Sequence, residues 1–168
     1  MTTLRPATLA DAAALKHVFD VSFVATFGHL YDPADLAAFM AGSTLQSWQE
    51  RLTDERFTGC VAQVGGIVAG YVLLGPPSLP GDWPADTVEL RTLYILPDHQ
   101  GLGLGTQLLE WAIGSARARG GQQLSLSVFV DNHRARRLYE RYGFTDVGRY
   151  DFKVGNHVDE DRLMLLAL

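Results

Sequence analysis

Three glycines at alternate positions, Gly101, Gly103 and Gly105, lie between a strand-like stretch and an apolar helical pattern. The first backbone N–H groups of a helix have no partners inside the helix, and the helix dipole adds partial positive charge at that end. Glycine lets the backbone come close to an anion and adopt positive φ angles. The residue types and their spacing therefore predict a phosphate site, and a pyrophosphate is the best match.

Other ligand-binding loops with glycines fit this stretch less well. A Walker loop is excluded because no Gly-Lys-Ser/Thr follows the glycines. A dinucleotide-binding loop has G-x-G-x-x-G directly after its strand, but Thr106 stands at the last glycine position and residues 97–101 intervene. Asp131 lies beyond the usual position of a ribose-binding acid. A tight turn without a ligand is the remaining alternative, and three alternating glycines disfavour it.

Several helices and strands must position this turn. The apolar spacing predicts helices over 11–27, after Pro33, over 45–52, from Leu104 to before Gly120, and over 132–142. Runs rich in β-branched and aromatic residues predict strands over 57–64, 66–74, 87–96 and 123–130, and near 144–152 and 161–168. The mixed order indicates one α/β or α+β domain over residues 1–168.

Composition excludes several classes of function. The net charge of −5 disfavours a nucleic-acid or anionic-membrane surface and suits cationic small molecules. Cys60 is the only cysteine and is expected in the core, and the five histidines lack ligand spacing, so no metal site is predicted. No leader or membrane-length apolar run is found, and a cytoplasmic protein is expected.

Two segments carry a resemblance to a known family. The stretch from Gln100 to Gly105, QGLGLG, is similar to the Q/R-x-x-G-x-G/A signature of the GCN5-related N-acetyltransferase (GNAT) superfamily. The segment from Asn132 to Phe144 resembles its N-x-x-A-x-x-x-Y…G-F pattern. The resemblance implies a GNAT-type fold, a mixed and mostly antiparallel sheet of about seven strands flanked by about four helices. Residues 22–39 and the chain end loosely resemble the bacterial spermidine/spermine acetyltransferase branch.

The resemblance implies that acetyl-CoA is the donor and that an amine attacks its thioester directly, in a ternary complex. The amine must lose a proton and the departing thiolate must gain one. Tyr139 is the expected acid, because a phenol stays protonated at neutral pH. Glu89 is the expected base, acting through a water molecule. The alternatives are a core position for Tyr139, and a solvent-facing position or a pairing with Arg91 for Glu89.

The resemblance also implies which residues contact each substrate. The two central strands are expected to splay apart around the pantetheine arm. The residues expected to bind the cofactor are Leu93, Tyr94, Ile95, Gln100, Gly101, Leu102, Gly103, Leu104, Gly105, Thr106, Asn132 and Arg141. Phe27 and Tyr31 are expected to line the acceptor pocket. The arginines over 134–141 are otherwise assigned to a solvated helix face, and residues 159–161 to a solvated turn, with an acidic rim that attracts polyamines as the alternative.

The expected acceptor is a primary amine of a small molecule, with a polyamine or amino-compound first. A protein or peptide N-acetyltransferase and a non-catalytic acyl-CoA sensor are the alternatives that the sequence leaves open. A homodimer is compatible with the resemblance, since dimers are frequent among similar proteins.

Overall fold

One seven-stranded sheet runs through the molecule, in the order β1-β2-β3-β4-β5-β7-β6. The computed structural model describes residues 1–168. The strands are β1 (Thr2–Pro6), β2 (Thr58–Val64), β3 (Ile67–Gly75), β4 (Thr87–Ile95), β5 (Gln123–Phe129), β6 (Thr145–Val154) and β7 (His157–Ala167). The helices are α1 (Ala12–Phe27), α2 (Pro33–Met40), α3 (Leu45–Thr53), α4 (Leu104–Ala118) and α5 (His133–Arg141). The expected mixed and mostly antiparallel sheet of seven strands is present, with five α-helices where about four were expected. None of the helices has the length and apolar character that crossing a membrane requires.

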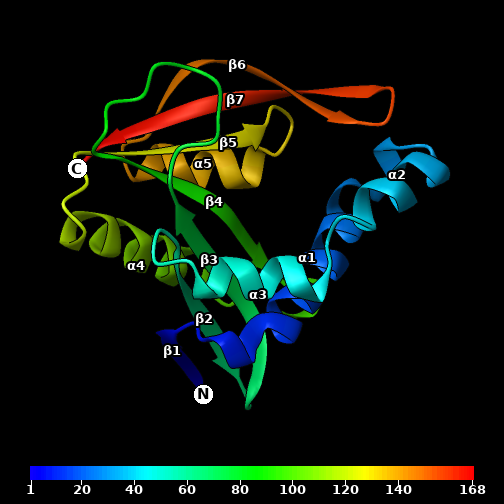
Figure 1. The fold of residues 1–168 in the computed structure, drawn as a ribbon, viewed down its shortest axis with the longest axis horizontal. Helices are drawn as coiled ribbons and strands as arrows, with labels where there is room; N and C mark the ends of the chain where they lie inside the picture. The colour runs from blue at the N-terminus through cyan, green and yellow to red at the C-terminus, as the bar shows by residue number, and fades with distance from the viewer.

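Helices cover both faces of the first half of the sheet (Figure 1). Successive side chains of a strand point to opposite faces, so neighbours on one strand enter different cores. On β2, Val61 packs with Leu15 of α1 and Trp48 of α3, whereas Cys60 packs with the α4 side chains. Cys60 is fully buried, and burial raises the pKa of its thiol to about 11. The predicted core position of Cys60 is confirmed.

The sheet opens between β4 and β5, its only parallel pair of strands. Thr87–Glu89 pair with Gln123–Ser125, and the ladder ends there. Leu74 pairs with Leu90 and Leu73 with Thr92, so Arg91 is an extra residue in a β-bulge that bends β4. Figure 1 shows β4 leaving β5 at this point. The expected divergence of the two central strands is present.

The second half of the sheet ends in the β6–β7 hairpin. Its turn is at Gly155–Asn156, where Gly155 has a φ of 57°, and β7 begins at His157. The solvated turn expected at 159–161 is therefore wrong, because the chain reverses earlier and these residues belong to β7. Their side chains alternate between the two faces of the hairpin.

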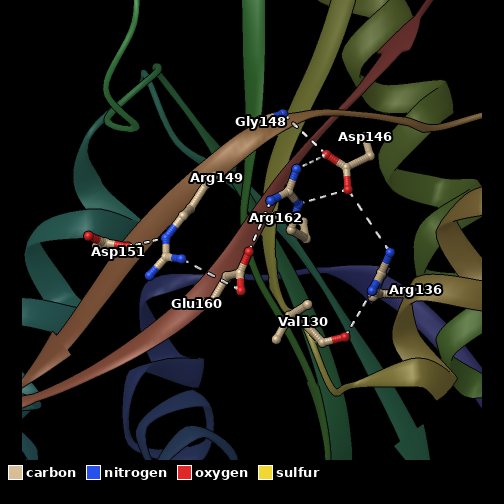
Figure 2. Close-up of polar contacts among 8 residues, drawn as sticks. All are labelled: Val130, Arg136, Asp146, Gly148, Arg149, Asp151, Glu160 and Arg162. Carbon is tan, nitrogen blue, oxygen red and sulfur yellow. Dashed lines mark hydrogen bonds and ion pairs between the residues drawn. The ribbon is translucent and has the colours of Figure 1, made fainter.

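Figure 2 shows the outer face of this hairpin, where Glu160 and Arg162 join a network of ion pairs. Arg162 Nε lies 2.8 Å from Asp146 Oδ2, and its Nη1 lies 3.1 Å from Glu160 Oε1. Arg149 Nη1 lies 3.7 Å from the other Glu160 oxygen. Glu160 is thus directed away from Asp159 and Asp161, which are buried on the inner face.

Candidate active site

A groove of about 890 Å³ lies along the part of β4 that has left β5, between the glycine turn and α5. The structure brings almost all of the predicted cofactor-binding residues to its walls. Those that line it are Leu93, Tyr94, Ile95, Gln100, Gly101, Gly103, Leu104, Gly105, Thr106, Asn132 and Arg141. Leu102 is the exception, because its side chain is 55% exposed and lies outside the lining.

The glycine turn forms one end of the groove. Gly101 and Gly103 have φ angles of 82° and 76°, in the left-handed region that favours glycine. Gly103 is the N-cap of α4, and its carbonyl accepts the hydrogen bond of the Gln107 N–H. The N–H groups of residues 104–106 precede that first helical bond, so they are free to bind an anion at the groove.

Arginines of α5 bring positive charge to the same groove. Arg134, Arg137 and Arg141 all line it, at a spacing of three and four residues that places them on one helix face. Arg134 Nη1 donates a hydrogen bond of 3.1 Å to the Gln100 side chain, and Arg141 Nη2 lies 3.5 Å from Thr106 Oγ1. The solvated face expected for these arginines is thus also a wall of the groove. Unpaired helix amides and three cations fit a ligand that carries several phosphates.

The helix α5 also carries the predicted acid. Asn132 is its N-cap, and its side-chain oxygen accepts a 3.3 Å hydrogen bond from the Ala135 N–H. Tyr139, two turns along the helix, is 7% exposed. Burial raises the pKa of Tyr139 to about 12, so its phenol is protonated at neutral pH.

Glu89 does not reach the groove. It is 4% exposed, and its carboxylate accepts hydrogen bonds from Ser78 N at 2.6 Å, Ser78 Oγ at 2.9 Å and Leu79 N at 3.1 Å. Arg91 Nε lies 3.4 Å from the same carboxylate, which matches the alternative pairing. The carboxylate therefore holds the loop after β3 against the start of β4, in a position that does not support the predicted role as general base.

A second cavity, of about 230 Å³, adjoins the groove. Its walls are mostly hydrophobic and rich in aromatic side chains, and they include Phe27 and Tyr31, the residues expected to line an acceptor pocket. The residues that line both the groove and the cavity are Phe27, Leu93, Tyr94, Asn132, Ala135 and Tyr139. Tyr139 therefore lies at the junction of the groove and the cavity.

Two carboxylates of β7 line the inner part of this cavity. Asp159 is 5% exposed, and it accepts a hydrogen bond of 2.5 Å from the Tyr31 hydroxyl. Burial, reinforced by Asp159, raises the pKa of Tyr31. His157 Nε2 lies 2.8 Å from the other oxygen of Asp159.

Asp161, two residues further along β7, is 8% exposed and also lines the cavity. Burial first, and the charge of Asp159 second, raise the pKa of Asp161 from 3.8 to about 6. These two acids were missed as site residues. The signal for them was the i, i+2 spacing of Asp159 and Asp161 in a segment that ends in an apolar strand.

A sheet that opens between two parallel strands, with a glycine turn at the opening and a buried tyrosine at its inner end, defines an acetyltransferase architecture. The model of the Acetyltransferase (GNAT) family matches residues 19–144. The chain therefore belongs to the GNAT family of N-acetyltransferases.

Individual relatives agree with this assignment. An uncharacterised N-acetyltransferase of Mycobacterium tuberculosis is 30% identical over 161 residues, which cover 95% of this chain and 99% of that protein. The phosphinothricin N-acetyltransferase of Streptomyces viridochromogenes is 33% identical over 150 residues, covering 86% of this chain and 75% of that protein. The structure of yncA from Salmonella typhimurium, solved with its cofactor acetyl-CoA, is similar with a TM-score of 0.70 at 27% identity, and covers 100% of this chain and 94% of that one.

Proposed function

We propose that this protein transfers the acetyl group of acetyl-CoA to a primary amine of a small molecule. The observation that carries the proposal is the junction of the phosphate-compatible groove with a small, acid-lined cavity at Tyr139. Acetyl-CoA supplies an activated acetyl thioester, and every other contribution comes from the side chains and backbone around it.

On the donor side, the N–H groups of residues 104–106 and the guanidinium groups of Arg134, Arg137 and Arg141 would hold the phosphates. The edge of β4 at Leu93 and Ile95 is left without a β5 partner, because the β4–β5 ladder ends at Glu89. The Ile95 carbonyl already accepts hydrogen bonds from Ser22 Oγ and Gln100 Nε2. The other backbone groups of this edge would bind and orient the pantetheine amides as an added strand does.

Tyr139 would provide the proton that the departing sulfur needs. Its hydroxyl makes no hydrogen bond with another side chain or the backbone, and its pKa of about 12 keeps the proton on the oxygen until a thiolate is formed. Such general acid catalysis contributes about 10²- to 10⁴-fold to a rate.

The cavity supports a small and cationic acceptor. A volume of about 230 Å³ is below the usual range for drug-sized ligands, roughly 300–1,000 Å³, and suits a small molecule better than a protein N-terminus. Two carboxylates line it, and its one basic residue, Arg91, has its guanidinium engaged by Pro76 O and Glu89. A polyamine or a simple amino-compound is therefore the first choice, ahead of a carboxylate-bearing amino compound.

The test measures binding and transfer separately. Calorimetry should show that acetyl-CoA binds and that NAD does not. Thiol release is then followed with a panel of amines: diamines and polyamines, monoamines, amino acids, phosphinothricin and short peptides. Turnover of the diamines or monoamines would support the proposal. Turnover of peptides alone, or tight acetyl-CoA binding with no turnover at all, would contradict it and favour the peptide enzyme or the sensor.

A further inference from the structure

We propose that Asp161 is the residue that binds the ammonium group of the acceptor and takes its proton. This inference rests on the proposed transfer to an amine, and it assigns to β7 the role that the sequence pattern gave to Glu89.

The position of Asp161 combines burial with access to the cavity. It faces the inner side of the β6–β7 hairpin, opposite to Glu160 and Arg162, and lies across from Phe129 on β5 and Tyr150 on β6. Although 92% of its surface is covered, it is part of the cavity wall. No cation pairs with it, so its negative charge has no partner within the protein.

The two acids of the cavity have different surroundings. Asp159 already binds the Tyr31 hydroxyl through one oxygen and His157 through the other. Asp161 has only the Ser127 hydroxyl beside it, which opposes part of the rise in its pKa. Asp159 is thus held as part of the wall, whereas Asp161 is available to a ligand.

The other charged and titratable groups around Asp161 include no cation that is free to pair with it. They are Asp159 on β7, Tyr31 after α1, Arg91 and Tyr94 on β4, Tyr139 on α5 and Tyr150 on β6. Burial raises the pKa values of Tyr94 and Tyr139, so both are protonated at neutral pH. An unpaired buried carboxylate is costly, and a cationic guest is the group that relieves that cost. The aromatic walls favour a cation as well.

The proton balance follows from this placement. The acceptor enters as R–NH₃⁺ and forms an ion pair with the Asp161 carboxylate. One proton moves from nitrogen to the carboxylate, and the neutral nitrogen forms a C–N bond with the acetyl carbon as the C–S bond breaks. The sulfur takes a proton from Tyr139, whose oxygen is reprotonated by the second proton of the nitrogen. Asp161 then releases its proton to solvent, so one proton is released for each amide and thiol formed.

The experiment compares Asp161→Asn with Asp159→Asn and with Glu160→Gln, the control on the same strand but the opposite face. With the amine that the wild type uses best, Asp161→Asn should lower kcat/KM at pH 7 by about 100-fold or more. Because the variant must bind the neutral amine from solution, its log(kcat/KM) should rise by one for each pH unit toward the amine pKa of about 10. The ratio of wild-type to variant kcat/KM should then fall below tenfold. The wild-type profile should be flat above pH 7.

Two further measurements separate this role from a structural one. Calorimetry with the coenzyme A complex should show that Asp161→Asn weakens amine binding at least tenfold, whereas the acetyl-CoA Kd changes less than threefold. Asp161→Ser, with a smaller uncharged side chain, should give the same pH profile if Asp161→Asn folds poorly. Glu160→Gln should match the wild type in all of these readouts.

The outcomes are distinguishable from failure of the proposed function. A wild-type enzyme that acetylates amines while Asp161→Asn retains its kcat/KM, or loses the same factor at every pH, would overturn the role of Asp161 alone. A wild-type protein that binds acetyl-CoA but acetylates no amine would overturn the proposed function itself.

Discussion

Replacement of Asp161 by Asn should stabilise the folded protein at neutral pH. The pKa of Asp161 is about 6 in the fold, against 3.8 for an ordinary aspartate, so folding disfavours the ionised form. This difference corresponds to at most about 3 kcal/mol of destabilisation. Because water in the cavity screens the charge, we expect about 1–2 kcal/mol, and asparagine keeps the shape while it removes that charge.

The sign of the effect fixes its pH window. Well below pH 3.8 the carboxyl is protonated in both the folded and the unfolded chain, so the wild type and the variant should be equally stable. Between about pH 4 and 6 the folded chain retains a proton that the unfolded chain has lost, and wild-type stability falls as pH rises. Above about pH 6 the whole destabilisation is present and stays constant.

Thermal unfolding of both proteins from pH 4 to 8 measures this. A change of 1–2 kcal/mol in a chain of 168 residues shifts Tm by about 3–6 °C, so the variant should unfold that much higher at pH 8 and within about 1 °C of the wild type at pH 4. Glu160→Gln should give no such gain, since it removes a partly exposed carboxylate that pairs with Arg149 and Arg162. An Asp161→Asn variant that is less stable than the wild type at pH 8 would refute the reasoning that this charge is unpaired.

Three other perturbations have defined outcomes. Tyr139→Phe should lower kcat about 100-fold and leave the acetyl-CoA Kd unchanged, as measured by thiol release and calorimetry. Tyr142, whose hydroxyl donates a hydrogen bond to Glu110, is the control. An equal loss of kcat in Tyr142→Phe would contradict a specific role of Tyr139 as the acid. Gly103→Ala should destabilise the fold by about 1 kcal/mol through its positive φ and weaken acetyl-CoA binding severalfold, and an unchanged Kd would remove the turn from the phosphate site. Glu89→Gln should lower Tm, because the variant loses part of the hydrogen bonding to residues 78 and 79, and it should reduce kcat/KM less than tenfold. A 100-fold loss of kcat with an unchanged Tm would restore Glu89 as the base.

The donor side of the site could be predicted from the sequence because its chemistry is local. The glycine turn and the start of α4 are contiguous, and a backbone that must adopt positive φ at Gly101 and Gly103 leaves a direct trace in residue type. Asn132 and Tyr139 likewise belong to one short segment, so a single motif of the resembling family implied both of them, and both line the groove. The arginines of that helix were harder to assign, since a solvated face and a phosphate-binding face have the same spacing.

The acceptor side could not be predicted in the same way. Whether Glu89 reaches the reacting groups depends on the loop after β3, which folds back onto its carboxylate. Whether Asp161 faces the cavity depends on the position of the β6–β7 turn. Moving a strand by one residue exchanges the faces of all its side chains. The turn at Gly155–Asn156 places Asp159 and Asp161 inside and Glu160 outside.

This difference bears on how the protein selects its acceptor. The groove includes the backbone amides of the glycine turn and is suited to a constant donor, whereas the cavity adds side chains of β5, β6 and β7 that lie far from that turn in the sequence. Exchanging a residue that lines the cavity alone, such as Asp159 or Asp161, leaves the groove residues in place, so acceptor preference can change without loss of acetyl-CoA binding. In this chain the cavity has two carboxylates and no free cation, so it should discriminate against acceptors by their charge before their shape. An amine whose carboxylate lies close to the ammonium group would bring a second negative charge beside Asp161, and like-charge contacts in a buried site are strongly unfavourable.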